Sequence, residues 1–210
     1  MRKTIIVIGA EHDCAAIGKH VVNYAIDECV QCSDNVYVAT HNERIAEIAE
    51  QAMCETILIK NKNGTVKTAV ERVCKEDCDV LFCSGNSVML VKEIINKCIV
   101  ELRGNEKITG VMTVYRDPGH PRNSVFESRY GYCQEYKEIA KLPEKPAYRF
   151  DGLVLGFRSE NIDSTEGPRK YPFLGAKVKL IKSSWFSGRT IENDMDKKLA
   201  EAYLKCGGLQ

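Results

Sequence analysis

The feature that most constrains the fold of this chain is an alternation between short apolar runs and longer amphipathic segments. The short runs are rich in β-branched residues, which is typical of strands buried on both faces of a parallel sheet. The order of the segments predicts an α/β fold with a mostly parallel sheet, helices on both faces and right-handed crossovers. We predict strands at residues 4–9, 35–40, 55–60, 79–84, 109–115, 148–157 and 176–183. We predict helices at residues 18–30, 65–75, 87–102 and 193–204, with a further helix capped by Asn42.

The length of the chain favours a single domain. Its 210 residues, of which 44% are hydrophobic, suffice for one substantial core. The alternation of strand-like and helix-like segments stops between residues 116 and 145, where Pro118, Pro121 and Pro143 accompany several aromatic and many charged residues. We therefore expect one domain over residues 1–210, with an excursion from the sheet that contains a short hairpin.

Charge and hydropathy exclude several classes of function. Lys and Arg number 30 against 29 Asp and Glu, so the formal net charge of +1 supplies no basic surface for nucleic acid. The longest apolar runs, residues 5–8 and 88–91, are far shorter than the roughly 20 residues that cross a bilayer. The first residues carry no export signal. We expect a cytoplasmic protein with neither a nucleic acid nor a membrane as its partner.

The ten cysteines allow two interpretations. Without an export signal we expect reduced thiols, most of them small core residues. A structural zinc site commonly uses two close pairs of cysteines, and Cys29 with Cys32 form the one C-x-x-C here. The other close group is Cys74, Cys78 and Cys83. Because one buried helix face gives the same three-residue spacing as C-x-x-C, we favour the core interpretation.

Ligands of an open parallel sheet bind beyond the carboxyl ends of its strands, where helix N-termini present unpaired N–H groups. After the first strand, Gly9, Ala10 and Lys19 are candidates to bind a nucleotide and its phosphates. The alternative is an ordinary strand-to-helix loop, because the segment matches neither common glycine-rich phosphate motif. His41 follows the second strand, and we expect it to be a solvated or capping side chain.

The fourth strand is followed by a second group of candidates, Ser84, Gly85 and Asn86. Glycine lets a ligand approach the backbone closely, and both neighbours can hydrogen-bond to it. The alternative is an ordinary helix cap.

The last predicted helix begins with the carboxylates Glu192, Asp194 and Asp196. Acidic residues stabilise the positive end of the helix dipole, which is the structural explanation. The functional one is magnesium, which typically takes one or two protein carboxylates together with phosphate oxygens.

Several segments, in the same order, resemble the CMP-N-acylneuraminate synthetase family of cytidylyltransferases, with CMP-Kdo synthetases as more distant relatives. The resemblance covers nearly the whole chain and includes the His-Pro pair at His120. The matching segments are IGKHVVNYAIDEC (residues 17–29), VYVATHNERIAEIAE (36–50), LPEKPAYRFDGLVLGFR (142–158) and RTIENDMDKKLAEAYL (189–204).

The resemblance implies a three-layer Rossmann-like nucleotidyltransferase fold with a small protruding dimerisation element at residues 116–147. In the family reaction, the anomeric hydroxyl of a sugar acid attacks the α-phosphate of CTP, and pyrophosphate leaves. Arg149 corresponds to a sugar-site arginine, Asp151 replaces an asparagine that contacts the sugar, and Phe173 lies near aromatic residues that wall the sugar pocket. The resemblance also implies a CTP-binding, Mg²⁺-dependent homodimer that acts on an acidic sugar.

The sequence departs from the family at the phosphate site. The family's phosphate loop reads A-R-x-x-S-K-x-x-P-G-K-N. The corresponding segment of this chain is markedly shorter, and only Gly18 and Lys19 match, at the later G-K of the family loop. Asn86 takes the place of a metal-ligand aspartate, and Glu192 is the one carboxylate that remains of a later D-I-D. We therefore assign catalytic roles to Lys19 and Glu192 and metal binding to Glu192 and Asn86.

Three hypotheses follow from these observations. The chain is an active cytidylyltransferase for a sialic-acid-like sugar, an inactive relative that binds a nucleotide, sugar or protein, or a transferase for a different nucleotide or sugar. All three require the turn after the first strand, the Ser84 corner and the acidic start of the last helix to form one pocket.

Overall fold

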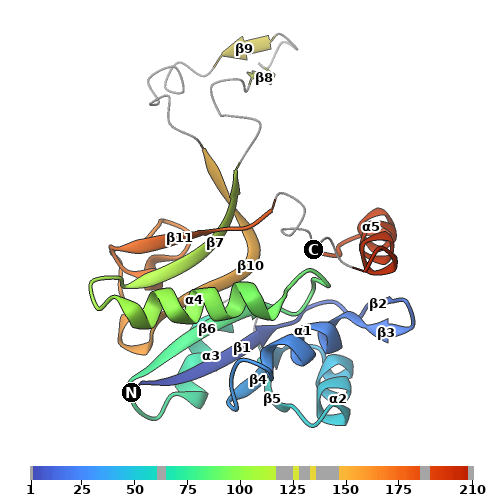
Figure 1. Cartoon of the computed structure of the whole chain (residues 1–210), viewed down its shortest axis with the longest axis horizontal. Helices are drawn as coiled ribbons and strands as arrows, with labels where there is room; N and C mark the ends of the chain where they lie inside the picture. The colour runs from blue at the N-terminus through green and yellow to red at the C-terminus, as the bar shows by residue number, and fades with distance from the viewer. Residues whose placement is uncertain are drawn as a thin grey trace.

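A seven-stranded sheet forms the centre of the computed structural model, which describes residues 2–60, 65–116, 125–127, 133–135, 147–184 and 190–207 (Figure 1). Its strand order is β11-β7-β10-β6-β1-β4-β5. Only β10 runs antiparallel to its neighbours, β6 and β7, so the predicted mostly parallel α/β sheet is confirmed. The strands are β1 (Lys3–Gly9), β4 (Val36–Thr40), β5 (Glu55–Leu58), β6 (Cys78–Ser84), β7 (Gly110–Arg116), β10 (Tyr148–Arg158) and β11 (Val178–Lys182).

Helices cover both faces of the sheet because successive residues of the buried strands point to opposite sides. Ile6 and Ile8 of β1 pack in one cluster with residues of α1, α2 and α4. Ile5 and Val7 pack on the other face with residues of α3 and of the turn η4. The helices are α1 (Val21–Cys29), α2 (Glu43–Gln51), α3 (Thr65–Val73), α4 (Lys92–Gly104) and α5 (Asp194–Lys205), and the 3-10 turns are η3 (Ser159–Asn161) and η4 (Pro172–Leu174).

The prediction that a helix begins near Gly18 is wrong. Residues Ala15–Ala16 (β2) and Lys19–His20 (β3) form a short antiparallel hairpin instead, and α1 begins at Val21. The turn between the two strands places Ile17 and Gly18 at φ values of 49° and 73°, outside the helical region. The loop after β1 therefore leads into a hairpin rather than directly into a helix N-terminus.

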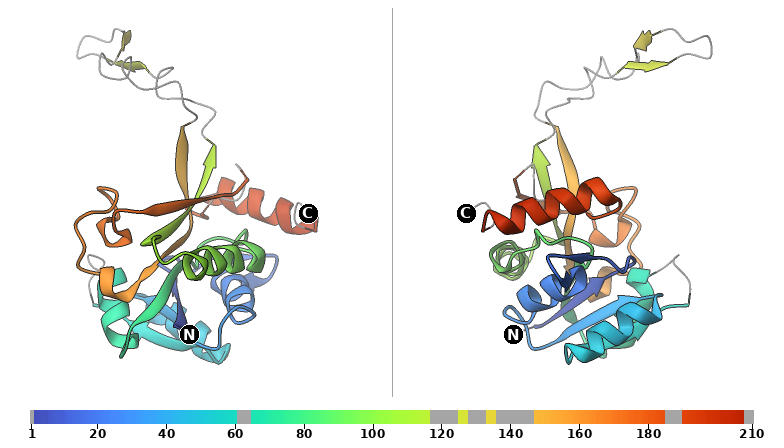
Figure 2. Two further views of the ribbon diagram at one scale, coloured as in Figure 1. Left: turned by 60° about the vertical axis from the view of Figure 1, so that its left-hand side comes forward. Right: turned by 90° about the vertical axis from the view of Figure 1, so that its right-hand side faces the viewer.

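The helix predicted from residue 87 begins only at Lys92. The preceding loop carries Val88 and Met89, which are buried in a third cluster together with Ile191 and Ala200 of the C-terminal segment. This small core holds α5 against β2, beyond the carboxyl end of β1 (Figure 2). The loop thus attaches the last helix to the sheet.

The segment between β7 and β10 extends out of the sheet and returns to it beside the point where it left. Arg116 at the end of β7 lies opposite Tyr148 at the start of β10. Strands β8 (Val125–Glu127) and β9 (Cys133–Glu135) form an antiparallel pair, which confirms the predicted hairpin. The rest of the proposed dimerisation segment 116–147 lies outside the described residues.

The described cysteines are free thiols, and most are core residues. Burial raises the pKa of Cys32 and Cys54 to about 11 and that of Cys98 to about 12. Among the described residues, no three His, Cys, Asp or Glu side chains are grouped so as to hold a metal ion. Cys29 and Cys32 therefore fit the core interpretation of the C-x-x-C pair.

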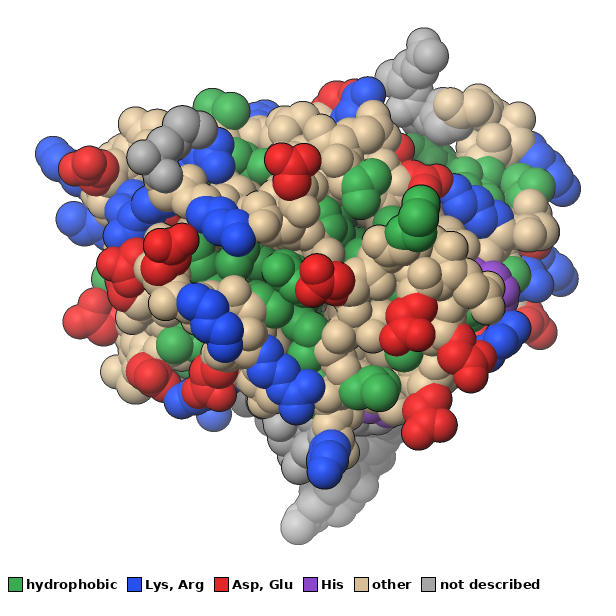
Figure 3. Space-filling view, turned by 90° about the horizontal axis from the view of Figure 1, so that it is seen from below, with side chains coloured by type: hydrophobic (Ala, Val, Ile, Leu, Met, Phe, Trp, Pro, Cys, Tyr) green, Lys and Arg blue, Asp and Glu red, His purple; other side chains and the backbone are tan. Residues whose placement is uncertain are grey.

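Charged side chains of both signs are interspersed over the face of the molecule shown in Figure 3. None of the helices within the described ranges has both the length and the apolar character needed to cross a membrane.

Candidate functional site

Asn86 joins the loop after β6 to the loop after β1. The two strands end side by side, with Gly9 opposite Ser84, and the N–H of Gly85 donates to the carbonyl of Gly9 at 2.8 Å. The side-chain oxygen of Asn86 accepts from the backbone N–H groups of Glu11 and His12, at 3.2 and 3.4 Å. The asparagine thus fixes the path of the chain as it leaves β1.

The start of the last helix reaches the same point. Ile191 is buried, and its backbone N–H donates to the carbonyl of Asn86 at 2.8 Å. Asn193 then caps α5 by accepting from the N–H groups of Met195 and Asp196. The loop after β1, the Ser84 corner and the acidic start of α5 therefore meet at one place. Of the single pocket predicted from them, the loop after β1 and Asn86 supply lining residues, whereas the described residues at the start of α5, Glu192 included, supply none.

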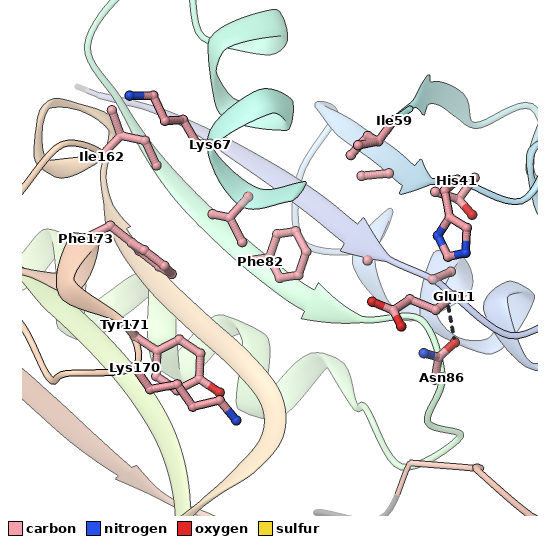
Figure 4. Close-up of a pocket in the computed structure, with 15 residues that line it drawn as sticks. Glu11, His41, Ile59, Lys67, Phe82, Asn86, Ile162, Lys170, Tyr171 and Phe173 are labelled. Carbon is pink, nitrogen blue, oxygen red and sulfur yellow. Dashed lines mark hydrogen bonds between the residues drawn. The ribbon is translucent and has the colours of Figure 1, made fainter. Parts of the chain in front are cut away.

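A pocket of about 560 Å³ opens beside this junction, at the carboxyl ends of the central strands (Figure 4). Its volume lies within the range of roughly 300–1,000 Å³ that is usual for small-molecule sites. Phe82 of β6 lies in the middle of the pocket, with Lys67 and Ile162 toward one end and Glu11 toward the other. The lining residues are Gly9, Ala10, Glu11, Ala39, Thr40, His41, Ile59, Val66, Lys67, Phe82, Asn86, Ile162, Lys170, Tyr171 and Phe173.

The ring of Phe82 lies so close to the backbone at position 9 that it leaves no room there for a side chain. A Cβ atom at position 9 would lie 2.5 Å from Cζ of that ring, closer than any ordinary van der Waals contact. Gly85 is similarly confined, because a Cβ there would lie 2.7 Å from Cβ of Ala10. Both glycines therefore allow close packing where β1 and β6 reach the pocket.

The pocket carries charges of both signs. Lys67, in the first turns of α3, lies 2.5 Å from a carboxylate oxygen of Asp163, and this hydrogen bond raises the lysine pKa. Lys170 extends over the ring of Tyr171, with its Nζ 5.5 Å from the ring centroid. Glu11 contributes the opposing negative charge. The site is thus an apolar centre flanked by two lysines and one carboxylate.

Lys19 does not line this pocket. It lies on β3, where its ammonium donates to Asp27 of α1 and sits 4.5 Å from the centroid of the Tyr24 ring. The hairpin directs the side chain toward α1. Lys19 is consequently not brought together with Gly9, Ala10 and Asn86.

The two predicted metal ligands differ in how well they fit magnesium. The side-chain oxygen of Asn86 already accepts two backbone hydrogen bonds, which occupy both lone pairs of an amide oxygen. Asn86 therefore does not fit as a ligand. Glu192 is exposed, and its carboxylate accepts one bond from a side chain of the described residues, at 3.2 Å from the Thr190 hydroxyl. A single carboxylate with nucleotide phosphates and water is a set that Mg²⁺ accepts.

The residues assigned to the sugar lie on two faces of the sheet. Phe173 lines the pocket and packs against Phe157 on the α3 face, with ring centroids 4.9 Å apart. Asp151 is only 2% exposed and accepts a hydrogen bond from the Thr113 hydroxyl at 2.5 Å. It lies toward α4, on the opposite face of the sheet, where it helps to raise the pKa of Cys98. Arg149 is exposed on the same strand as Asp151, opposite Tyr115 of β7. Arg149 and Asp151 are thus near each other, and Phe173 is apart from them.

Sequence patterns did not predict the lysine and aromatic residues Lys67, Phe82, Lys170 and Tyr171, nor did they predict several aliphatic lining residues. Phe82 reads as one more apolar residue of a buried strand. The other three come from α3 and from the loop after β10, and no local pattern links those segments to the end of β1. The aromatic side chain of Phe82 near the carboxyl end of β6 was an available signal.

Comparisons with known proteins identify the fold. No family model matches the sequence, and no curated protein matches it. Among solved structures, a 4-diphosphocytidyl-2C-methyl-D-erythritol synthase from Anaerococcus prevotii DSM 20548 superposes with a TM-score of 0.69 at 14% identity, over 96% of this chain and 99% of that one. A CMP:2-keto-3-deoxy-manno-octonic acid synthetase complexed with CTP superposes with a TM-score of 0.72 at 13% identity, over 98% and 99%. The chain has the fold of these two enzymes over their entire length.

Proposed function

We propose that this chain is a cytidylyltransferase that binds CTP at the carboxyl ends of β1, β4 and β6 and transfers CMP to a sialic-acid-like sugar acid. The observation that carries the proposal is the junction at Asn86, which brings the loop after β1 and the start of α5 to the edge of one pocket. The shared fold with a synthetase complexed with CTP supports the choice of nucleotide. The resemblance of residues 142–158 to sialic acid enzymes supports the choice of sugar.

The pocket offers complementary groups to each part of such a substrate. The ring of Phe82, packed over Gly9, provides an apolar surface for a planar base. Lys67 and Lys170 provide ammonium groups for phosphate or carboxylate oxygens. His41 and Thr40 add polar groups at the end of β4. Together they suit a molecule that combines one ring with several negative charges.

The reaction needs positioning more than covalent help from the protein. The anomeric hydroxyl oxygen of the sugar bonds to the α-phosphorus of CTP and its proton passes to solvent, while the bond to the bridging oxygen of the β-phosphate breaks and pyrophosphate leaves. Glu192 would hold Mg²⁺, which supplies neutralisation of the charge that develops on the phosphates. Arg149 is suited to a bidentate clamp on the carboxylate of the sugar.

A second candidate function is nucleotide binding without turnover. Two observations favour it. The ammonium of Lys19 is paired with Asp27 instead of reaching the pocket, and the N–H groups of Glu11 and His12 are already bonded to Asn86. Both features remove donors that a triphosphate would use. The carboxylate of Glu11 at the pocket adds repulsion.

A third candidate is transfer of a different nucleotide or to a different sugar. Phe173 and Arg149 lie on opposite faces of the sheet, so a sugar acid that contacts both differs in its binding from the arrangement that the family resemblance implies.

We also propose homodimerisation through residues 116–147, which sedimentation of the full chain and of a variant lacking residues 120–143 would test.

Release of pyrophosphate distinguishes the candidates. The wild type would be incubated with each nucleoside triphosphate, Mg²⁺ and a panel of sugar acids, beside Glu192→Ala, Lys19→Ala and the control Lys97→Ala on the exposed side of α4. Release with CTP and a sialic-acid-like sugar, reduced by Glu192→Ala and unchanged by Lys97→Ala, is the expected result. Binding of CMP with no release from any nucleotide supports the second candidate, and release with another nucleotide or sugar supports the third.

A further inference from the structure

A pair of thiols lies at the end of the sheet opposite the pocket. Cys74 directly follows α3, and Cys78 is the first residue of β6. Their sulfur atoms are 2.8 Å apart. A disulfide bond is about 2.05 Å long, so the two sulfurs need to approach by less than an ångström to form one.

The surroundings hold the pair in this position. The backbone N–H of Cys74 donates to the carbonyl of Val70, which continues the hydrogen bonding of α3. The N–H of Cys78 donates to the hydroxyl of Ser159 at 3.0 Å, on the segment that follows β10. Both cysteines are thus fixed by backbone bonds to different elements, and neither sulfur depends on a flexible chain end for its place.

A hydrogen bond between two cysteine side chains also joins Cys29 and Cys83, but both of those residues are buried, whereas Cys74 is partly exposed. In the Cys74–Cys78 pair, the hydrogen bond between the two sulfurs raises the pKa of Cys74 and lowers the pKa of Cys78, because the remaining S–H stabilises the first thiolate that forms. The nearby ammonium of Lys3 favours the thiolate of either residue, while Asp79 opposes it at Cys78. By contrast, burial raises the pKa of Cys32, whose sulfur donates to backbone carbonyls.

Solvent reaches this pair through a separate hollow of about 290 Å³. Cys74 lines the hollow and is partly exposed, whereas Cys78 is buried behind it. The polar residues around Cys74 in this hollow are Glu71, Lys75, Glu76, Asp77, Ser159 and Glu160. Because acidic side chains predominate there, an uncharged reagent approaches Cys74 more readily than an anionic one.

We propose that Cys74 and Cys78 are a redox modification site, which forms a reversible disulfide by exchange with a small uncharged disulfide. In the first step the partly exposed Cys74 reacts: its proton passes across the sulfur–sulfur hydrogen bond to the Cys78 thiolate, its sulfur bonds to one sulfur of the reagent, and the other half leaves as a thiolate that takes a proton from solvent. In the second step the sulfur of Cys78 attacks that of Cys74, and the second small thiol leaves with the Cys78 proton. Two protein thiols and one small disulfide thereby become one protein disulfide and two small thiols.

The disulfide would connect the end of α3 to the start of β6 through a loop of three residues, Lys75, Glu76 and Asp77. The other end of α3 brings Val66 and Lys67 to the pocket. The proposal does not depend on the proposed function, since it concerns the thiols alone.

The test uses the full-length chain in mixtures of 2-hydroxyethyl disulfide and 2-mercaptoethanol of increasing oxidising ratio. After acid quenching, free thiols are alkylated, and the protein is digested with a protease that cleaves after Lys75, between the two cysteines. The expected result is a linked pair of peptides carrying Cys74 and Cys78, which increases with the oxidising ratio and disappears with excess dithiothreitol.

Two variants separate this pair from other thiols. Cys74→Ser, at the partly exposed position, is expected to abolish the linked peptides, and Cys206→Ser, at an exposed thiol in the last turn, to leave them unchanged. Wild-type protein that keeps both thiols alkylated at the most oxidising ratio would overturn the proposal. So would a linkage that maps to another pair, such as Cys29 with Cys32. Peptide mapping of the wild type gives this answer even if a variant fails to fold.

Discussion

The backbone N–H of Ile191 donates a 2.8 Å hydrogen bond to the carbonyl oxygen of Asn86, across more than one hundred residues of sequence. This bond fixes the chain just ahead of α5 against the loop after β6. The side chain of the same Asn86 accepts from Glu11 and His12 in the loop after β1. One asparagine therefore holds three segments together at the edge of the pocket.

The side chain of Asn86 is expected to stabilise the fold through its two hydrogen bonds. Asn86→Ala removes both, at about 0.5–1.5 kcal/mol each, and should lower the free energy of unfolding by about 1–3 kcal/mol in urea titrations. Asn86→Asp is the matched control, because a carboxylate oxygen also accepts from the N–H groups of Glu11 and His12. Equal stability of the wild type and the alanine variant would contradict the role of Asn86 as a clamp.

Gly9 and Phe82 are expected to act as a pair. A Cβ at position 9 would lie 2.5 Å from Cζ of the ring, so Gly9→Ala forces the ring out of its position in the pocket. We expect this variant to lose about 1–3 kcal/mol of stability and to bind nucleotide more weakly. Phe82→Leu in the same chain should recover stability, because the smaller side chain leaves room for the new methyl group. Thermal unfolding of the single and double variants measures this, and equal losses in both would refute the pairing.

Lys67 is expected to contribute its charge to nucleotide binding, in competition with Asp163. Because Lys67→Ala removes an ammonium group from the pocket, it should weaken CTP binding by about tenfold. Asp163→Asn should tighten binding, because it releases the ammonium from its partner at 2.5 Å. Calorimetric titrations would report both effects. A variant at Asp163 that binds CTP more weakly than the wild type would show that the ion pair itself supports the pocket.

Two carboxylates should give opposite pH dependences of stability. Burial raises the pKa of Asp79 from its ordinary value of 3.8, so the folded state holds this proton more tightly than the unfolded state. Its contribution is fully present below pH 3.8 and is lost as the pH rises through the folded pKa. We therefore expect wild type to lose stability relative to Asp79→Asn as the pH rises from about 3 to about 7.

Glu160 shows the reverse behaviour. Burial is the largest single influence and opposes its charge, but the hydrogen bond from Arg2, a backbone hydrogen bond and the charges of Arg2 and Arg158 together outweigh it and lower the pKa below 4.5. Its contribution is present above pH 4.5 and is lost as the pH falls through the folded pKa. The stability of wild type relative to Glu160→Gln should therefore increase over the same rise in pH. Urea unfolding across the pH range measures both slopes, and slopes of the same sign would contradict these assignments.

The sequence predicted the sheet well because its signal is local. Residues 5–8 are apolar at every position, and a strand buried on both faces needs that pattern. The start of α1 was mispredicted because Ile17 and Gly18 adopt positive φ values, which the periodicity of the neighbouring residues does not reveal. Local pattern thus determined the strands, while turn geometry determined where helices begin.

The site was predictable only in part, because it is assembled from distant segments. The rule on strand ends correctly located Gly9 and Asn86 at one edge. It gave no indication of Lys67 or Lys170, which reach the pocket from α3 and from the loop after β10. Nor did it indicate that the Asn86 oxygen would be occupied by backbone N–H groups, since that depends on the exact course of the loop after β1.

Titration of CTP with Mg²⁺ into the wild type and into the double variant Lys67→Ala/Lys170→Ala tests whether the pocket is a nucleotide site. Lys97→Ala, on the exposed side of α4, is the control for lost charge. We predict saturable binding of one CTP per chain, weakened at least tenfold in the double variant and unchanged in the control. Absence of binding to wild type, or equal affinity in all three proteins, would contradict a nucleotide site at the carboxyl ends of β1, β4 and β6.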